Sequence, residues 1–137
     1  MEWQMQAIRG ATTVPENTVN SITLAVTELL DELEKRNNLH PSNIISVTFS
    51  VTKDLNVIYP AAIARSRPNW DRVSMLDVQQ MYVPNSLEGC IRFLTHAYLP
   101  SSNQVSHIYL RRAANLRPDW SLPQPLQASQ SEVESQV

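Results

Sequence analysis

"NTVNSITLAVTELLDELEKRNNL", residues 17–39, carries the helical pattern that decides the predicted fold class. Its apolar side chains recur at three- and four-residue spacing, which places them on one face of a helix. These face residues are Val19, Ile22, Val26, Leu29, Leu30 and Leu33. Asn17 is the predicted N-cap, and Asn37–Asn38 mark the predicted end of the helix. Such a one-sided helix needs a second layer of structure to cover its apolar face.

Strand patterns lie on both sides of this helix. Residues 4–14 and 43–52 are apolar or β-branched stretches, as expected of strands. Further strands are predicted at 72–78, 90–99 and 105–113, and a short helix after Tyr59–Pro60 that stops before Pro68. We predict one α+β domain over residues 1–122, a mixed sheet with helices on one face. Residues 123–137 contain two prolines and few apolar residues, and are predicted to form a flexible tail.

The overall composition excludes several classes of function. Hydrophobic residues make up 42% of the 137-residue chain, and the net charge is −2, so a basic nucleic-acid surface is not expected. No apolar stretch approaches a membrane span, and the N-terminal sequence does not resemble a secretory signal. Cys90 is the only cysteine, so an internal disulfide is impossible. A cytoplasmic protein is expected.

The positive charge of the chain is carried mainly by arginine, with nine arginines and two lysines. Arg9, Arg92 and, more loosely, Arg117 lie within apolar sequence that is predicted to form strands. A charge there is costly unless it is paired, so each arginine either forms a structural ion pair or binds an anion in a cleft. Acidic residues are scarce between Lys35 and the tail, which favours an external anion for at least one of them.

Other kinds of chemistry find little support in the sequence. The three histidines lack metal-ligand spacing, so no metal site is predicted, and two glycines are too few for a glycine-rich phosphate loop. Cys90 in an apolar strand is expected to be inert. Tyr109 is a candidate ligand-binding residue, although bonding to the backbone is the commoner role of a buried tyrosine. The result is an arginine-lined anion site without evident acid–base or covalent machinery, and no cofactor is expected.

Four segments, in this order and at this spacing, resemble the monofunctional chorismate mutases of the AroH class. They are "IRGATTV" (8–14), "DLNVIYPAAIAR" (54–65), "CIRFLTHAY" (90–98) and "HIYLRRAANLRPD" (107–119). The resemblance covers residues 5–122. It implies a homotrimeric pseudo-α/β-barrel with active sites between neighbouring subunits. It also implies the Claisen rearrangement of chorismate to prephenate, a step of phenylalanine and tyrosine biosynthesis that needs no covalent intermediate and no proton transfer.

The same resemblance assigns roles to individual residues. Arg9 and Tyr109 match residues that bind a substrate carboxylate, and Arg92 matches the arginine that reaches the breaking ether bond. Tyr59 and Arg65 match residues that the neighbouring subunit contributes. Leu116 and Arg117 match the stretch that folds over the occupied site. Ala62 stands in place of a family lysine near the mouth of the site.

The segment "MLDVQQM" (75–81) departs from the family pattern. Gln80 stands where the family has a glutamate that accepts a bond from the ring hydroxyl, and Asp77 stands where a cysteine touches the same region. We predict that Asp77 supplies the missing negative charge, that Gln80 keeps the hydrogen bond, and that Gln79 is dispensable. Both Asp77 and Gln80 would then enter one cleft, which requires a bend near Val78–Gln79 because side chains alternate along a straight strand.

Two alternatives remain open from the sequence. Asp77 is either the recruited carboxylate or an ordinary strand-end acid, solvated or paired with a structural arginine such as Arg72. The loss of the family glutamate and lysine at Gln80 and Ala62 is also compatible with a non-catalytic trimeric module that binds a small dicarboxylate ligand. A purely structural oligomer would leave Arg9 and Arg92 unexplained.

Overall fold

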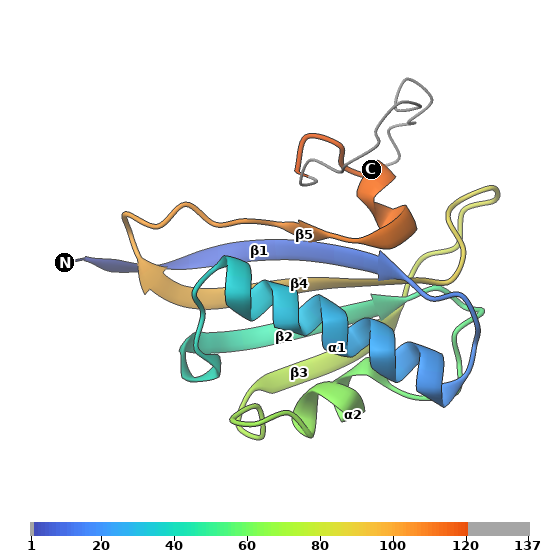
Figure 1. Cartoon of the computed structure of the whole chain (residues 1–137), viewed down its shortest axis with the longest axis horizontal. Helices are drawn as coiled ribbons and strands as arrows, with labels where there is room; N and C mark the ends of the chain where they lie inside the picture. The colour runs from blue at the N-terminus through green and yellow to red at the C-terminus, as the bar shows by residue number, and fades with distance from the viewer. Residues whose placement is uncertain (1, 121–137) are drawn as a thin grey trace.

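A five-stranded mixed sheet forms the centre of the computed structural model, which describes residues 2–120 (Figure 1). The strand order is β3-β2-β4-β1-β5. The strands are β1 (Trp3–Thr13), β2 (Ile44–Val51), β3 (Ser74–Gln79), β4 (Cys90–Pro100) and β5 (Ile108–Tyr109). The long strands β1 and β4 are antiparallel throughout, from Trp3 opposite Pro100 to Thr13 opposite Cys90, while β3 pairs with β2 in parallel. The predicted α+β class with a mixed sheet is confirmed.

Helices α1 (Val19–Arg36) and α2 (Pro60–Arg65) cover one face of this sheet, in front of it in Figure 1. The apolar face of α1 packs on alternate side chains of the central strands, because successive residues of a strand point to opposite faces. The buried helix residues are Ile22, Ala25, Val26, Leu29, Leu30 and Leu33, and the sheet presents Ile8, Val47, Phe49, Ile91 and Phe93 to the same core. None of the described helices is long and apolar enough to cross a membrane.

The other face of the sheet, here called the open face, has no helix over most of its area. It carries the opposite set of strand residues, which includes large apolar side chains in contact with solvent. Met5 is 57% exposed and Leu76 is 61% exposed, and Val78, Leu94 and Tyr98 are exposed as well. Large exposed apolar side chains on one face indicate a surface that another molecule covers.

Two predictions about the start of α1 are wrong. Thr18, not Asn17, is the N-cap: its Oγ1 accepts a hydrogen bond of 3.1 Å from the Ser21 N–H. Asn17 instead pairs with Asn56, which ties the start of α1 to the loop after β2. Val19, predicted on the apolar face, is half exposed, because the first turn of the helix extends beyond the edge of the core.

The predicted strand at 105–113 is also wrong over most of its length. Only β5 pairs, with Gly10 opposite Ile108 and Ala11 opposite Tyr109. Arg111 adopts a positive φ of 54°, which turns the chain into a 3-10 helix, η2 (Arg111–Asn115). The end of the predicted domain at residue 122 and the predicted tail at 123–137 lie outside the described residues.

Candidate active site

Arg9 and Arg92 come from adjacent strands and line one hollow of about 500 Å³ on the open face. Arg9 lies in β1 and Arg92 in β4, and each neighbours a residue that points into the helix-covered core, Ile8 and Ile91 respectively. Alternation therefore turns both guanidinium groups toward the open face. The remaining wall is the loop that follows β3, with Gln80, Met81 and residues 83–86. Two converging arginines make this hollow a site for an anion.

Gln80 is fixed beside Arg92. The Arg92 Nε donates to the Gln80 Oε1 at 3.0 Å, and the Gln80 backbone N–H donates to the Val51 carbonyl at 2.7 Å. The side chain of Gln80 thus holds the guanidinium of Arg92 by one edge. The predicted association of these two residues in one site agrees with this geometry.

Tyr109 lies close to the same arginines. It is buried in a small cluster with Cys90 and Leu116, under the segment that follows β5. Burial raises the pKa of the Tyr109 hydroxyl, although the positive charges of Arg9, Arg117 and Arg92 act in the opposite direction. The hydroxyl is therefore neutral near pH 7 and able to donate a hydrogen bond. Burial likewise raises the pKa of the Cys90 thiol, so this group is not an activated nucleophile.

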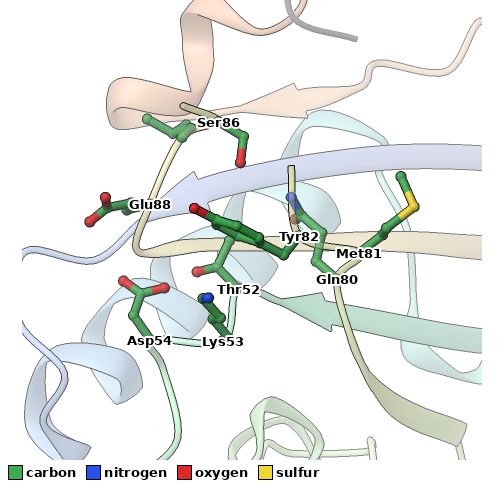
Figure 2. A pocket seen from close by; sticks show the side chains of 9 residues that line it. Thr52, Lys53, Asp54, Gln80, Met81, Tyr82, Ser86 and Glu88 are labelled. Atoms are coloured by element: carbon green, nitrogen blue, oxygen red, sulfur yellow. The ribbon is translucent and has the colours of Figure 1, made fainter. Parts of the chain in front are cut away.

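A second, smaller hollow of about 190 Å³ lies beside the first and shares Gln80 with it (Figure 2). Lys53 extends under the ring of Tyr82, with its Nζ 3.8 Å from the ring centroid, while Met81 points away from both. Asp54 accepts a 2.9 Å bond from the Gly89 N–H, where a φ of +57° favours glycine. These contacts fasten both ends of the 80–88 loop to the end of β2, and so hold Gln80 in place.

Asp77 lies on the opposite face of the sheet from Gln80. Strand β3 runs to Gln79 in unbroken register with β2, so the predicted bend at Val78–Gln79 is absent. Asp77 therefore points toward α2, where its Oδ1 accepts a 3.0 Å bond from the Ala61 N–H. Burial raises the pKa of its carboxyl, while the Ala61 N–H and the charge of Arg65 lower it. The prediction that Asp77 and Gln80 of one chain enter one cleft is wrong.

Tyr59 and Asp77 line a different hollow, of about 520 Å³, at the start of α2. Tyr59 is 71% exposed, and Arg65 at the end of α2 is exposed too. The described chain thus contains two separate groups of the predicted site residues. Arg9, Gln80, Arg92 and Tyr109 gather on the open face, whereas Tyr59, Arg65 and Asp77 gather around α2. Gln79 lines the hollow at the start of α2 and not the hollow between Arg9 and Arg92.

The predicted closing residues, Leu116 and Arg117, lie close to Tyr109, and two further residues nearby were not predicted to belong to the site. His107 accepts a hydrogen bond from the Arg9 backbone N–H, and Trp120 stacks on the His107 ring. The sequence pattern tests His107 only as a metal ligand, and Trp120 belongs to no periodic pattern. Neither residue could therefore be predicted as part of the site. Within residues 2–120, no group of three potential metal ligands is present.

The fold and the first hollow define the class: an α+β protein with an arginine-lined site for a small anion. The chain belongs to the type I chorismate mutases, whose family model matches residues 5–120. It is 33% identical over 119 residues to the chorismate mutase AroH of Bacillus subtilis, covering 86% of this chain and 94% of that protein. Identity to the Thermus thermophilus chorismate mutase AroH is 38% over 118 residues, covering 84% and 95%.

A solved structure agrees with this assignment. The chorismate mutase from Clostridium thermocellum superposes with a TM-score of 0.72 at 39% sequence identity, covering 79% of this chain and 96% of that one. The resemblance drawn from the sequence is confirmed, and the chain is an isomerase of this family.

Proposed function

We propose that the chain converts chorismate to prephenate in the hollow between Arg9 and Arg92. The reaction breaks the ether C–O bond of the enolpyruvyl side chain and forms a C–C bond to the ring within one molecule, so no proton or other group is transferred. The protein has to hold a dianion in its compact conformation and stabilise charge on the ether oxygen. The convergence of the two guanidinium groups on one hollow is the observation that carries this proposal.

Arg9, Arg92 and Gln80 line the hollow, and Tyr109 lies close to its arginines. Arg9 and Tyr109 bind a substrate carboxylate, and Arg92 donates to the ether oxygen, where negative charge grows in the transition state. Gln80 holds Arg92 through its Oε1 and keeps its amide N–H₂ for the substrate. Leu116 and Arg117 close over the bound molecule. No step in this scheme requires a cofactor.

We further propose that a neighbouring subunit of a homotrimer completes the site. Tyr59 and Arg65 lie apart from Arg9 and Arg92 in one chain, and Tyr59 is too exposed for an aromatic residue with a purely structural role. The exposed apolar side chains of the open face supply a surface for such an assembly. Asp77 belongs to the same group as Tyr59, so the negative charge would reach the substrate from the neighbouring subunit. A cytoplasmic location remains our expectation.

The direct test follows chorismate consumption and prephenate formation spectroscopically. Arg92→Ala is expected to lower kcat by about 10²–10³, as removal of a well-placed charge-stabilising donor does. Arg36→Ala is the matched control: Arg36 forms a partly exposed i,i+4 pair with Glu32 on α1, away from the hollow, and should leave turnover unchanged.

Absence of turnover by the wild-type protein at high concentration would overturn the proposal. It would leave the alternative function, a non-catalytic module that binds a small dicarboxylate. A mild effect of Arg92→Ala in an active protein would instead show that the role given to Arg92 is wrong.

A further inference from the structure

Trp120 lies between two side chains of the substrate-binding region. Its ring centroid is 3.8 Å from that of His107, with an interplanar angle of 30°, and 3.5 Å from the Arg117 guanidinium carbon. Two groups at van der Waals distance from one ring cannot share the same space, so they occupy opposite faces of the indole. The sandwich is closed by a turn in which the Trp120 N–H donates to the Arg117 carbonyl at 2.9 Å. Pro118 takes the second position of this turn, which its fixed φ favours.

His107 connects this sandwich to Arg9. Its Nδ1 accepts a 3.0 Å hydrogen bond from the backbone N–H of Arg9, at a point where β5 has not yet begun to pair with β1. The Arg9 guanidinium carbon is itself 5.8 Å from the Trp120 ring centroid, within cation–π range. Trp120 therefore lies near Arg9 at two points: it reaches the Arg9 backbone through His107, and it lies 5.8 Å from the Arg9 guanidinium carbon.

We propose that Trp120 is a positioning residue for the substrate-binding arginines Arg9 and Arg117. The indole holds the Arg117 guanidinium against one face and, through His107 on the other, fixes the backbone of Arg9. This inference rests on the proposed function, because it assigns the residue an effect on substrate binding. Arg117 also pairs with Asp119 at 2.9 Å, so its guanidinium is aligned before substrate arrives.

Protonation of His107 should release Arg9. The hydrogen bond from Arg9 requires a bare Nδ1, which exists only in the neutral imidazole. Burial lowers the pKa of His107, and the charges of Arg117 and Arg9 lower it further, while Asp119 raises it. The neutral form thus persists below the ordinary range of a histidine. Removal of the Trp120 indole would expose the imidazole of His107 to solvent, so the pKa of His107 should rise again.

The test compares Trp120→Ala and the conservative Trp120→Phe with the wild type in steady-state kinetics between pH 4.5 and 8, roughly the range over which histidine titrates. Trp120→Ala should raise KM about tenfold, the size of one lost cation–π contact of moderate strength, and leave kcat within about threefold. The acid-side rise in KM should shift to higher pH in this variant. Trp120→Phe, which keeps an aromatic face, should recover most of the loss in KM.

A second measurement does not depend on turnover. Protonated imidazole quenches indole fluorescence, so the emission of Trp120 should fall on acidification with a midpoint below the ordinary pKa of histidine. Trp120→Phe, which retains Trp3 and Trp70, should lack this transition. An unchanged KM and acid limb in Trp120→Ala, or an acid transition that survives in Trp120→Phe, would overturn the positioning role. If the wild-type protein shows no turnover but its fluorescence still falls on acidification, the proposed function would be wrong and the contact between Trp120 and His107 would stand.

Discussion

Asp77 and Gln80 lie on opposite faces of the sheet. Gln80 retains a contact with Arg92 but brings no charge, and Asp77 brings a charge but is bound to the first turn of α2. One Asp77 oxygen is engaged by the Ala61 N–H, which fixes the direction of the carboxylate. A carboxylate held in this way can act electrostatically on a molecule bound next to α2 without moving.

We expect Asp77→Asn to lower kcat about tenfold to a hundredfold, less than loss of a direct donor to the reacting oxygen. Folding should be preserved, because the amide oxygen of asparagine can accept the Ala61 N–H bond. Above the raised pKa of Asp77, unfolding free energy should be equal or slightly higher in the variant, since the folded state no longer has to keep a partly buried carboxyl ionised. Turnover and thermal unfolding measured on the same samples separate the two effects.

Gln80→Glu in the Asp77→Asn background should restore rate, if one negative charge near the substrate is what both positions supply. The exposed Asp71, in the turn before β3, offers a matched control, and Asp71→Asn should have no effect on turnover. A silent Asp77→Asn would mean that Asp77 has only a structural role, as the acceptor of the Ala61 N–H bond at the first turn of α2.

At the scale of elements, the site depends on how the ends of strands are held. The 80–88 loop is fixed by Asp54 at Gly89 and by Lys53 at Tyr82, so that Gln80 meets Arg92. Strand β1 is held on the other side by β5 and by α1, whose buried residues contact the same core as Ile8. The placement of Arg9 therefore depends on the packing of α1 as well as on its own strand.

The N-terminus of α1 provides a test of this dependence. Thr18→Ala should lower the free energy of unfolding by about 1 kcal/mol, because the Ser21 N–H loses its side-chain acceptor. Thr23→Ala, within the same helix, should cause no such loss, since alanine has the higher helix propensity. Chemical denaturation of the two variants measures the difference. Equal stabilities would show that the cap at Thr18 contributes nothing.

At the scale of the whole molecule, the open face is the feature that a single chain leaves unexplained. Its exposed apolar side chains lie on the neighbouring strands β1 and β4, with Met5 and Leu94, and on the edge strand β3 beyond β2, with Leu76 and Val78. The two hollows that hold the predicted site residues lie on different faces, so one chain alone does not bring them together. Assembly through this face would account for both facts.

We expect the wild-type protein to sediment as a trimer and Leu94→Asp to sediment as a smaller species with little turnover, because a charge would replace an apolar contact in the centre of the interface. Leu24→Asp is the matched control: Leu24 is 59% exposed on the solvent side of α1 and should leave both assembly and activity intact. Analytical ultracentrifugation and the prephenate assay report the two properties. An active monomer would contradict the shared site.

The sequence by itself determined the fold class, the long strands, the helix and the candidate arginines, because these follow from local periodicity and from the cost of a charge in apolar sequence. The sequence-based predictions were wrong where contacts between residues distant in the sequence decide the structure. The strand at 105–113 was cut to Ile108–Tyr109 by the turn at Arg111, and Asp77 was separated from Gln80 because β3 stays in register with β2 to its end. Trp120 contacts Arg117 in its own turn and His107, and His107 binds the backbone of Arg9, about a hundred positions away. Only the tertiary structure brings residues so far apart in the sequence together.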